Sequence, residues 1–154
     1  MTTIAEPPVQ ALPDAEPPGK VTAAFPYKEE SAGLARRKVR DTLRHWGLAD
    51  LIDIAVLVTS ELMTNAIQTG CQRAITLTIE RTAEFAVRIS VRDGSSYPPV
   101  FIDSGLPTDP ERVPLRGRGL LLVNRLAQRW GLDLEARGKT VYADLRLGQR
   151  PRSR

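Results

Sequence analysis

Cysteine and histidine are almost missing from the sequence, which has one of each among its 154 residues. The single cysteine, Cys71, cannot form an internal disulfide, so we expect the chain to work in a reducing compartment, the cytoplasm. His45 has no second histidine and no cysteine cluster to join, which argues against most zinc sites. The same absence argues against Cys-His and Ser-His-Asp catalysis.

Aromatic residues and long apolar runs are also scarce. Phe, Trp and Tyr make up 5% of the sequence, so the core should be aliphatic. No run of about 18 apolar residues occurs, so no membrane-spanning helix is predicted. The first residues, MTTIAEPPVQ, lack the basic start and apolar block of a secretory signal. Because 42% of the residues are hydrophobic, the chain can form one domain with its own core.

The formal net charge of +4 is too small an excess to predict a nucleic-acid partner by itself. Part of it lies at the C-terminus, where Arg150, Arg152 and Arg154 close the chain. Elsewhere the charged residues alternate in sign. We therefore expect a solvated surface with a basic tail, and binding to neither nucleic acid nor membrane.

Proline marks the first boundary of the predicted domain. Residues 1–18 contain five prolines and few large apolar groups, so an extended or disordered tail is predicted there. Residues 19–148 carry the patterned segments and are predicted to form one domain. Residues 149–154 are predicted to be a basic C-terminal tail.

Hydrophobic periodicity predicts an α+β fold. Strict alternation in AITLTIE (74–80) and FAVRISVRD (85–93) predicts an antiparallel hairpin with Phe85 on its buried face. Asp50 is predicted to cap the helix that it precedes. The other predicted elements are a strand at 21–25, helices at 29–46, 50–69 and 119–130, and strands at 132–136 and 141–147. This order predicts a two-layer α/β sandwich, in which helices cover one face of a mostly antiparallel mixed sheet.

A carboxylate and a carboxamide interrupt the apolar helix predicted at 50–69. Glu61 and Asn65 are four residues apart and therefore share one face of this helix. One interpretation is an ordinary polar pair on a wet face. The alternative is a functional pair, because the apolar residues around it leave little of the helix wet. A carboxylate in such a place needs a partner such as a metal ion or a substrate hydroxyl.

Asp93 ends the second strand of the predicted hairpin on the face that carries Val87, Ile89 and Val91. If the strand stays regular, the carboxylate points to the buried side and needs hydrogen-bond donors, for which the exocyclic amine of a purine is a candidate. The alternative is a turn-forming aspartate at the start of DGSS.

The third feature is GRGLLLV at 117–123. Gly117 and Gly119 open the predicted helix after a long loop, and the free N–H groups of such a helix start favour an anion such as phosphate. GKT at 138–140 does not predict a phosphate-binding loop of the Walker type. Asp133 stands where the first glycine of that motif would be, and a strand follows where a helix is required.

Together, SELMTNA, VRDGSS and GRGLLLV, in this order, resemble the sequence boxes of the GHKL (histidine-kinase-like) ATPase superfamily. The chain resembles in particular its small single-domain branch, the bacterial anti-sigma-factor serine/threonine kinases. The similarity covers about residues 20–147. It implies the Bergerat ATP-binding fold, with ATP and Mg²⁺ as ligands.

The resemblance implies a role for each matched residue. Glu61 would be the general base that accepts a proton from an attacking hydroxyl. Asn65 would be the magnesium ligand, since a small cation that keeps several waters suits one hard oxygen. Asp93 would recognise the amine of adenine.

The resemblance also implies an ATP lid. Gly117 and Gly119 match the glycines that close this lid over the phosphates. Arg112, Arg116 and Arg118 lie in the same segment and would offset phosphate charge.

The sequence departs from the family pattern at two places. Ser95 and Tyr97 stand where the motif DxGxG has glycines, so Ser95 would approach the nucleotide less closely than a glycine does. Lys139, followed by Thr140, stands where a threonine usually helps to bind adenine through water. Both Lys139 and Thr140 are candidates for contact with ATP.

Two functions from different classes are predicted. The first is a kinase that phosphorylates an anti-sigma-factor antagonist and sequesters a sigma factor, as a homodimer; Glu61 and Asn65 favour it. The alternative is a non-catalytic ATP-binding module that sequesters a partner, which the altered DxGxG favours. A histidine kinase is not predicted, because that class needs a phosphoacceptor helix domain and His45 has the sequence context of a helix end.

Overall fold

The computed structural model describes residues 19–69, 74–94 and 115–148, and of residues 115–120 the backbone alone. The elements in chain order are β1 (Lys20–Phe25), α1 (Glu30–His45), the short 3-10 helix η2 (Ala49–Leu51), α2 (Ile52–Ile67), β2 (Ile75–Ala83), β3 (Ala86–Asp93), α3 (Leu115–Leu126), β4 (Arg129–Glu135) and β5 (Gly138–Arg146).

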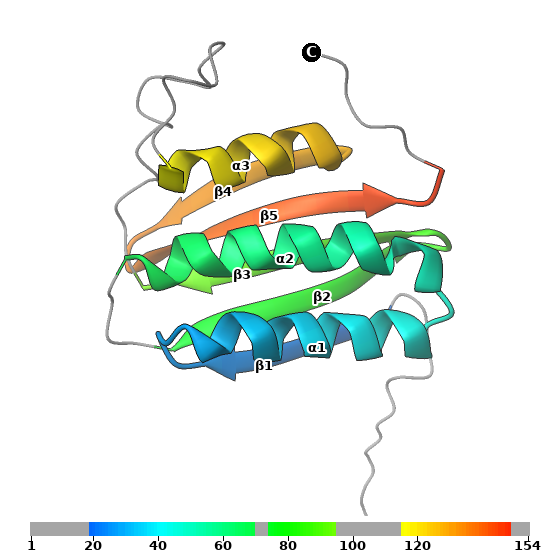
Figure 1. Cartoon of the computed structure of the whole chain (residues 1–154), viewed down its shortest axis with the longest axis horizontal. Coiled ribbons are helices and arrows are strands. Elements are labelled where there is room, and N and C mark those ends of the chain that lie inside the picture. The colour runs from blue at the N-terminus through cyan, green and yellow to red at the C-terminus, as the bar shows by residue number, and fades with distance from the viewer. Residues whose placement is uncertain (1–18, 70–73, 95–114, 149–154) are drawn as a thin grey trace, which may run out of the picture.

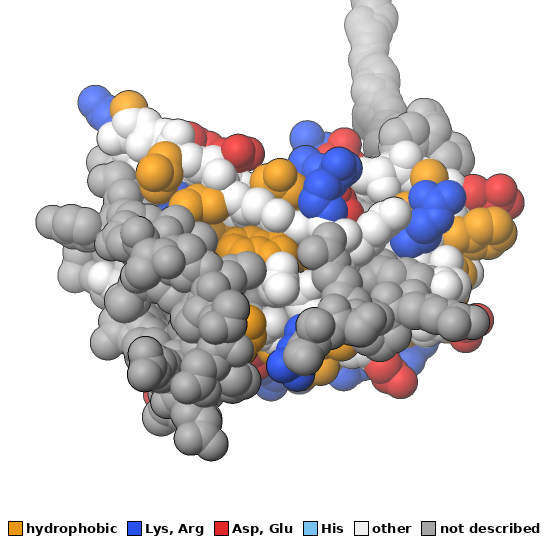
Figure 2. Space-filling model, turned by 90° about the horizontal axis from the view of Figure 1, so that it is seen from above, with side chains coloured by type: hydrophobic (Ala, Val, Ile, Leu, Met, Phe, Trp, Pro, Cys, Tyr) orange, Lys and Arg blue, Asp and Glu red, His pale blue; other side chains and the backbone are white. Residues whose placement is uncertain are grey.

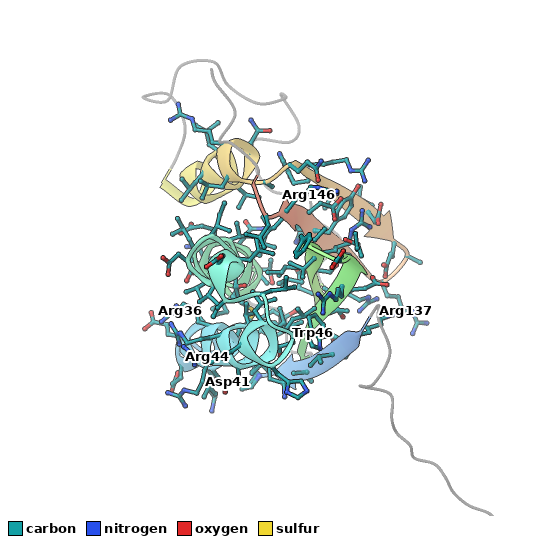
Figure 3. The ribbon with its side chains drawn as sticks, turned by 90° about the vertical axis from the view of Figure 1, so that its right-hand side faces the viewer. Arg36, Asp41, Arg44, Trp46, Arg137 and Arg146 are labelled. Atoms are coloured by element: carbon teal, nitrogen blue, oxygen red, sulfur yellow. The ribbon has the colours of Figure 1, made fainter. Side chains whose placement is uncertain are left out.

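The five strands form one sheet in the order β1-β2-β3-β5-β4, and every neighbouring pair is antiparallel. The helices α1, α2 and α3 cover the same face, with α2 between the other two (Figure 1). An end view separates the helix layer from the sheet layer (Figure 3). The predicted α+β two-layer sandwich is confirmed. The described strands pair antiparallel throughout, where the sequence predicted a mixed sheet.

The core lies between the two layers and is aliphatic, as the scarcity of aromatic residues predicts. Leu77 and Ile89 are fully buried on the helix-covered face of the hairpin, while Thr78 and Ser90 lie half-buried on the open face. Burial of apolar surface is the main stabilising term here. The helices contribute the buried side chains Val39, Leu43, Val58, Leu62, Met63 and Val123.

The last predicted helix is wrong at both ends. α3 spans Leu115–Leu126, so Gly117 lies inside its first turn instead of before the helix, and Gly119 lies in the second turn instead of at the start. It ends early because Arg129 and Trp130 leave the helix and pair with β5 at the edge of the sheet. Pairing with a neighbouring strand has overridden the local helical pattern.

Two smaller predictions are also wrong. Asp50 does not cap α2, because it lies in η2 and no side-chain cap hydrogen bond forms at the start of η2 or α2. Phe85 is not buried: it is 50% exposed in the turn of the hairpin. Glu84 and Phe85 form the turn between Ala83 and Ala86, which pair with each other, so the buried alternation of β3 begins after Phe85.

Charged side chains of both signs are mixed on the surface. On the face seen in Figure 2, lysine and arginine lie among aspartate and glutamate and do not gather into one basic patch. This agrees with the alternation of charge along the sequence. None of the described helices is long and apolar enough to cross a membrane.

The open face of the sheet carries an ion cluster centred on Asp144. Arg88 donates to Asp144 through Nε (2.7 Å to Oδ1) and Nη2 (3.0 Å to Oδ2), and Arg129 Nε donates to Oδ2 at 3.1 Å. The Arg88 guanidinium also lies 4.1 Å from the centre of the Tyr142 ring. Burial alone would raise the pKa of the Asp144 carboxyl, but the two arginines hold that pKa below its ordinary value.

We expect Asp144→Asn to lower the free energy of unfolding by about 1–2 kcal/mol at neutral pH, because it removes charge-assisted hydrogen bonds to partly exposed arginines. A carboxyl with a lowered folded-state pKa stabilises fully above its unfolded pKa of about 4. The penalty should therefore shrink as the pH falls from about 4 through the folded pKa. Urea unfolding at several pH values measures this, with the exposed Asp133→Asn as control. An equal penalty at pH ~3 and pH ~7 would contradict it.

Candidate functional site

Glu61 and Asn65 lie on the flank of α2 that faces away from α1. The flank toward α1 is identified by Ser60, whose Oγ accepts a hydrogen bond from Arg36 Nη1 at 3.1 Å. With 3.6 residues per turn, Glu61 and Asn65 lie about 100° and about 140° around the helix from Ser60. α3 packs against α2 on this other side (Figure 1). The two predicted residues therefore border the space between α2 and α3.

Both side chains on this flank are half-buried beside the buried stripe of α2. The helix has more solvent-facing surface than the sequence predicted, since Leu57 is 41% exposed and Thr64 is exposed. Among the described residues, neither Glu61 nor Asn65 has a hydrogen-bonding or ion-pairing partner. Their carboxylate and amide groups are therefore available to a ligand.

Asp93, at the end of β3, lies on the helix-covered face, as the alternation predicts, and is 1% exposed. Two neighbours hold this strand end in place. Gly94 N donates to the Tyr27 hydroxyl at 2.9 Å. On the other side, a Cβ on Gly138 would clash with the carbonyl oxygen of Asp93. β5 can begin so close to β3 because position 138 is a glycine.

Lys139 lies opposite Asp93 in the ladder between β3 and β5 and forms a buried ion pair with it. Its Nζ lies 3.0 Å from Oδ2 and 3.2 Å from Oδ1 of Asp93. The Lys139 and Asp93 side chains are 1% and 2% exposed. Sequence reasoning named both residues but missed their contact. One signal was available, because the buried positions Val141 and Ala143 extend the alternation back to Lys139.

The structure does not bring Thr140 to this site. Strand alternation puts its side chain on the open face of the sheet, where Oγ1 donates to Glu135 Oε2 at 3.3 Å. The prediction that Lys139 and Thr140 contact the same nucleotide is therefore corrected: adjacent residues of one strand point to opposite faces. Lys139 alone of the two lies beside Asp93.

Four elements meet at one end of the sheet (Figure 1): α2 and β3 end there, while β5 and α3 begin there. Asn65, Asp93 and Lys139 therefore share this end with the first turn of α3. The first backbone N–H groups of a helix have no partner inside it, and its dipole is positive there, so the start of α3 favours an anion. Gly117 lies in this first turn of α3, and Gly119 lies at the start of the second turn.

Several predicted residues lie outside what the structure describes. These are Ser95, Tyr97 and Arg112, together with the side chains of Arg116 and Arg118. Their roles at the phosphates and in the loop after Asp93 stay predictions.

The candidate site fits a magnesium ion that arrives with a nucleotide better than a resident metal. Among the described residues, no group of three or more His, Cys, Asp or Glu side chains could hold a metal ion. Mg²⁺ in nucleotide sites needs one or two protein oxygens, because phosphates and waters supply the rest. The half-buried amide oxygen of Asn65 fits such a ligand.

Two hollows lined by described residues lie at the opposite end of the sheet. One, of about 520 Å³, is formed around the Asp144 cluster and reaches Arg146. The other, of about 500 Å³, lies between the start of β1 and the end of α1, beside Trp46. Figure 3 looks at this end and labels Trp46 and Arg146. Neither hollow contains Glu61, Asn65 or Asp93, so neither belongs to the candidate site.

Residues 25–145 match the model of a protein family described as the histidine kinase-like ATPase domain. The matched range includes α1, α2, α3, the strands β2, β3 and β4 in full, all of β5 except Arg146, and all residues of the candidate site that the structure places. No curated protein matches the chain significantly.

We expect Lys139→Met to lower the free energy of unfolding by about 3–5 kcal/mol, because it leaves the Asp93 carboxylate buried without its cation. Adding Asp93→Asn should recover part of this loss, since a neutral amide needs no cation. Urea unfolding of both single variants and the double variant gives the coupling energy. The matched control is Arg92→Met, which breaks the Arg92–Glu135 pair, 42% and 40% exposed, and should cost less than about 1 kcal/mol. Additive effects at Asp93 and Lys139 would contradict the coupling.

Proposed function

The chain belongs to the histidine kinase-like ATPase domain family, whose members bind ATP, and on that premise we propose that it is a protein serine/threonine kinase. It would bind Mg-ATP and transfer the γ-phosphate to a hydroxyl of a partner protein. The observation that carries this proposal is that Asn65, Asp93 and the start of α3 share one end of the sheet, with Glu61 one turn of α2 before Asn65. These are the groups that such a transfer requires.

The adenine and the phosphates of ATP would lie at different parts of this end of the sheet. Asp93 would accept a hydrogen bond from the amine of adenine at the end of β3. The start of α3, with its free N–H groups and the backbone of Gly117 and Gly119, would face the phosphates. Arg118 would add positive charge there. Asn65 would hold Mg²⁺, which neutralises charge on the phosphates and on the leaving group.

Glu61 would act on the attacking group. The serine or threonine oxygen of the partner forms a bond to the γ-phosphorus while the bond to the β–γ bridging oxygen breaks. The proton of the hydroxyl passes to the Glu61 carboxylate, and ADP leaves. Positioning and electrostatic stabilisation supply most of the rate in this class of reaction. A half-buried carboxylate without a described partner is suited to receive that proton.

The partners that we propose follow from the resemblance to anti-sigma-factor kinases: an antagonist protein as phosphate acceptor, a sigma factor that is sequestered, and a second copy of the chain. Transfer to the histidine of the chain itself is not favoured. His45 is the last residue of α1, at the end of the sheet away from Asp93, so it lies far from the proposed γ-phosphate.

The second candidate function is a non-catalytic module that binds ATP and sequesters a partner. The departure from the DxGxG motif favours it, because Ser95 and Tyr97 stand where that motif has glycines. The two functions differ at Glu61, which the kinase requires and the module does not.

We expect isothermal titration calorimetry to show binding of Mg-ATP by the wild type and weaker binding by Asn65→Ala, by about tenfold or more, because the amide oxygen that holds Mg²⁺ is lost. Thr64→Ala is the matched control, since Thr64 is the exposed neighbour on α2. Mg-ATP at about 100 times its dissociation constant should also stabilise the wild type by about 2.7 kcal/mol. A folded wild type that does not bind Mg-ATP would contradict the proposal.

We expect Glu61→Gln to bind Mg-ATP like the wild type but to transfer phosphate about 10²- to 10⁴-fold more slowly, because an amide cannot accept the proton. Transfer of labelled γ-phosphate to proteins in an extract of the organism that makes the chain measures this, with the exposed Asp53→Asn of the same helix as control. Undiminished transfer by Glu61→Gln would show that Glu61 is not the base. A wild type that binds Mg-ATP and transfers nothing would instead support the module.

A further inference from the structure

The buried ammonium group of Lys139 has more hydrogen-bond donors than it has acceptors among the described residues. An ammonium group carries three N–H donors. The two carboxylate oxygens of Asp93 lie 3.0 and 3.2 Å from Nζ and can accept at most two of them. No other hydrogen bond or ion pair of Lys139 exists among the described residues, and its side chain is 1% exposed. At least one charged donor is therefore buried without an acceptor among the residues that the structure describes.

This unpaired donor destabilises the folded chain, and the fold could form without it. A buried charged donor without an acceptor loses its hydration and gains nothing in return. A methionine or leucine at this position, opposite an apolar partner, would pack at lower cost. An acceptor brought by a ligand would complete the shell of the ammonium group. Because Asp93 already balances the charge of Lys139, this acceptor should be neutral.

The pair also offers an acceptor next to a donor. The carboxylate of Asp93 has about four lone-pair sites, so it can accept a further hydrogen bond beside Lys139. The Watson–Crick edge of adenine has the complementary order: the 6-amino group donates and the adjacent ring nitrogen N1 accepts. A 6-oxopurine has the reverse order, with an oxygen at position 6 and a hydrogen on N1.

We propose that Lys139 donates its third hydrogen bond directly to N1 of adenine, while Asp93 accepts one from the 6-amino group. This inference rests on the proposed function, because it takes the end of β3 as the base site. Lys139 is then the residue that distinguishes adenine from 6-oxopurines, since the N1 hydrogen of those bases would meet the ammonium group. Thr140 cannot supply this contact, because it lies on the open face of the sheet.

The test compares ligands on the wild-type protein, which avoids any variant that fails to fold. Calorimetry is done with ATP, 1-deaza-ATP, 7-deaza-ATP and inosine triphosphate, each with Mg²⁺. The 1-deaza analogue replaces N1 by C–H and should bind about 10- to 100-fold more weakly than ATP, as expected for a lost bond to a charged donor. The 7-deaza analogue is the matched control, because N7 lies on another edge, and should bind like ATP. Inosine triphosphate should bind more weakly than 1-deaza-ATP.

Lys139→Met gives the second comparison where it folds, as far-ultraviolet circular dichroism shows. It should bind ATP and 1-deaza-ATP equally, because the group that distinguishes them is gone. Equal binding of ATP and 1-deaza-ATP by the wild type would overturn the inference and leave the proposed function intact. Tighter binding of inosine triphosphate than of ATP would also overturn it. A folded wild type that binds none of the four ligands would overturn the inference and the proposed function together.

Discussion

The buried pair between Asp93 and Lys139 is the interaction on which the candidate site depends. It joins the end of β3 to the start of β5, and the contact is possible because Gly138 lets the two strands approach. Removing two charges from water costs several kcal/mol for each ion, which mutual attraction offsets only in part. A pair of apolar side chains would hold the strands together at lower cost. The stability of the fold therefore does not explain these two residues, whereas the proposed contact with a ligand would.

A second buried carboxylate, that of Asp144 on β5, has different surroundings from the carboxylate of Asp93 on β3. Asp144 lies on the open face, at the other end of the sheet, between two guanidinium groups that donate three hydrogen bonds to its oxygens. One of them, Arg129, has a side chain that is 70% exposed, so water completes its hydrogen bonds. Asp93 instead pairs with the ammonium group of Lys139, and both side chains are almost fully buried. The arginines of the Asp144 cluster are partly exposed, so their remaining donors can reach water. The ammonium group of Lys139 is buried, and one of its donors has no acceptor among the described residues.

Alternation and helical spacing predicted how Asp93, Glu61 and Asn65 are placed, although alternation also put Phe85 wrongly on the buried face. The period of two in β3 predicted that Asp93 is buried, and the spacing of four predicted that Glu61 and Asn65 share a face. Properties that depend on distant partners could not be predicted. The contact of Lys139 with Asp93 needs the adjacency of β3 and β5, and α3 ends early because β4 pairs with β5. Thr140 was misplaced because the motif was matched along the chain without regard to the two faces of a strand.

At this end of the sheet, different groups would recognise the phosphates and the base of a nucleotide. A triphosphate is strongly anionic, and an unpaired buried carboxylate nearby would repel it across a medium of low dielectric constant. Lys139 removes that repulsion, because the pair with Asp93 is neutral. The positive start of α3 would then meet the phosphates without a competing negative charge beside the adenine. The neutral pair still presents a hydrogen-bond acceptor on Asp93 beside a hydrogen-bond donor on Lys139. Charge would therefore determine affinity at the phosphates, and hydrogen-bond order would determine which base is accepted.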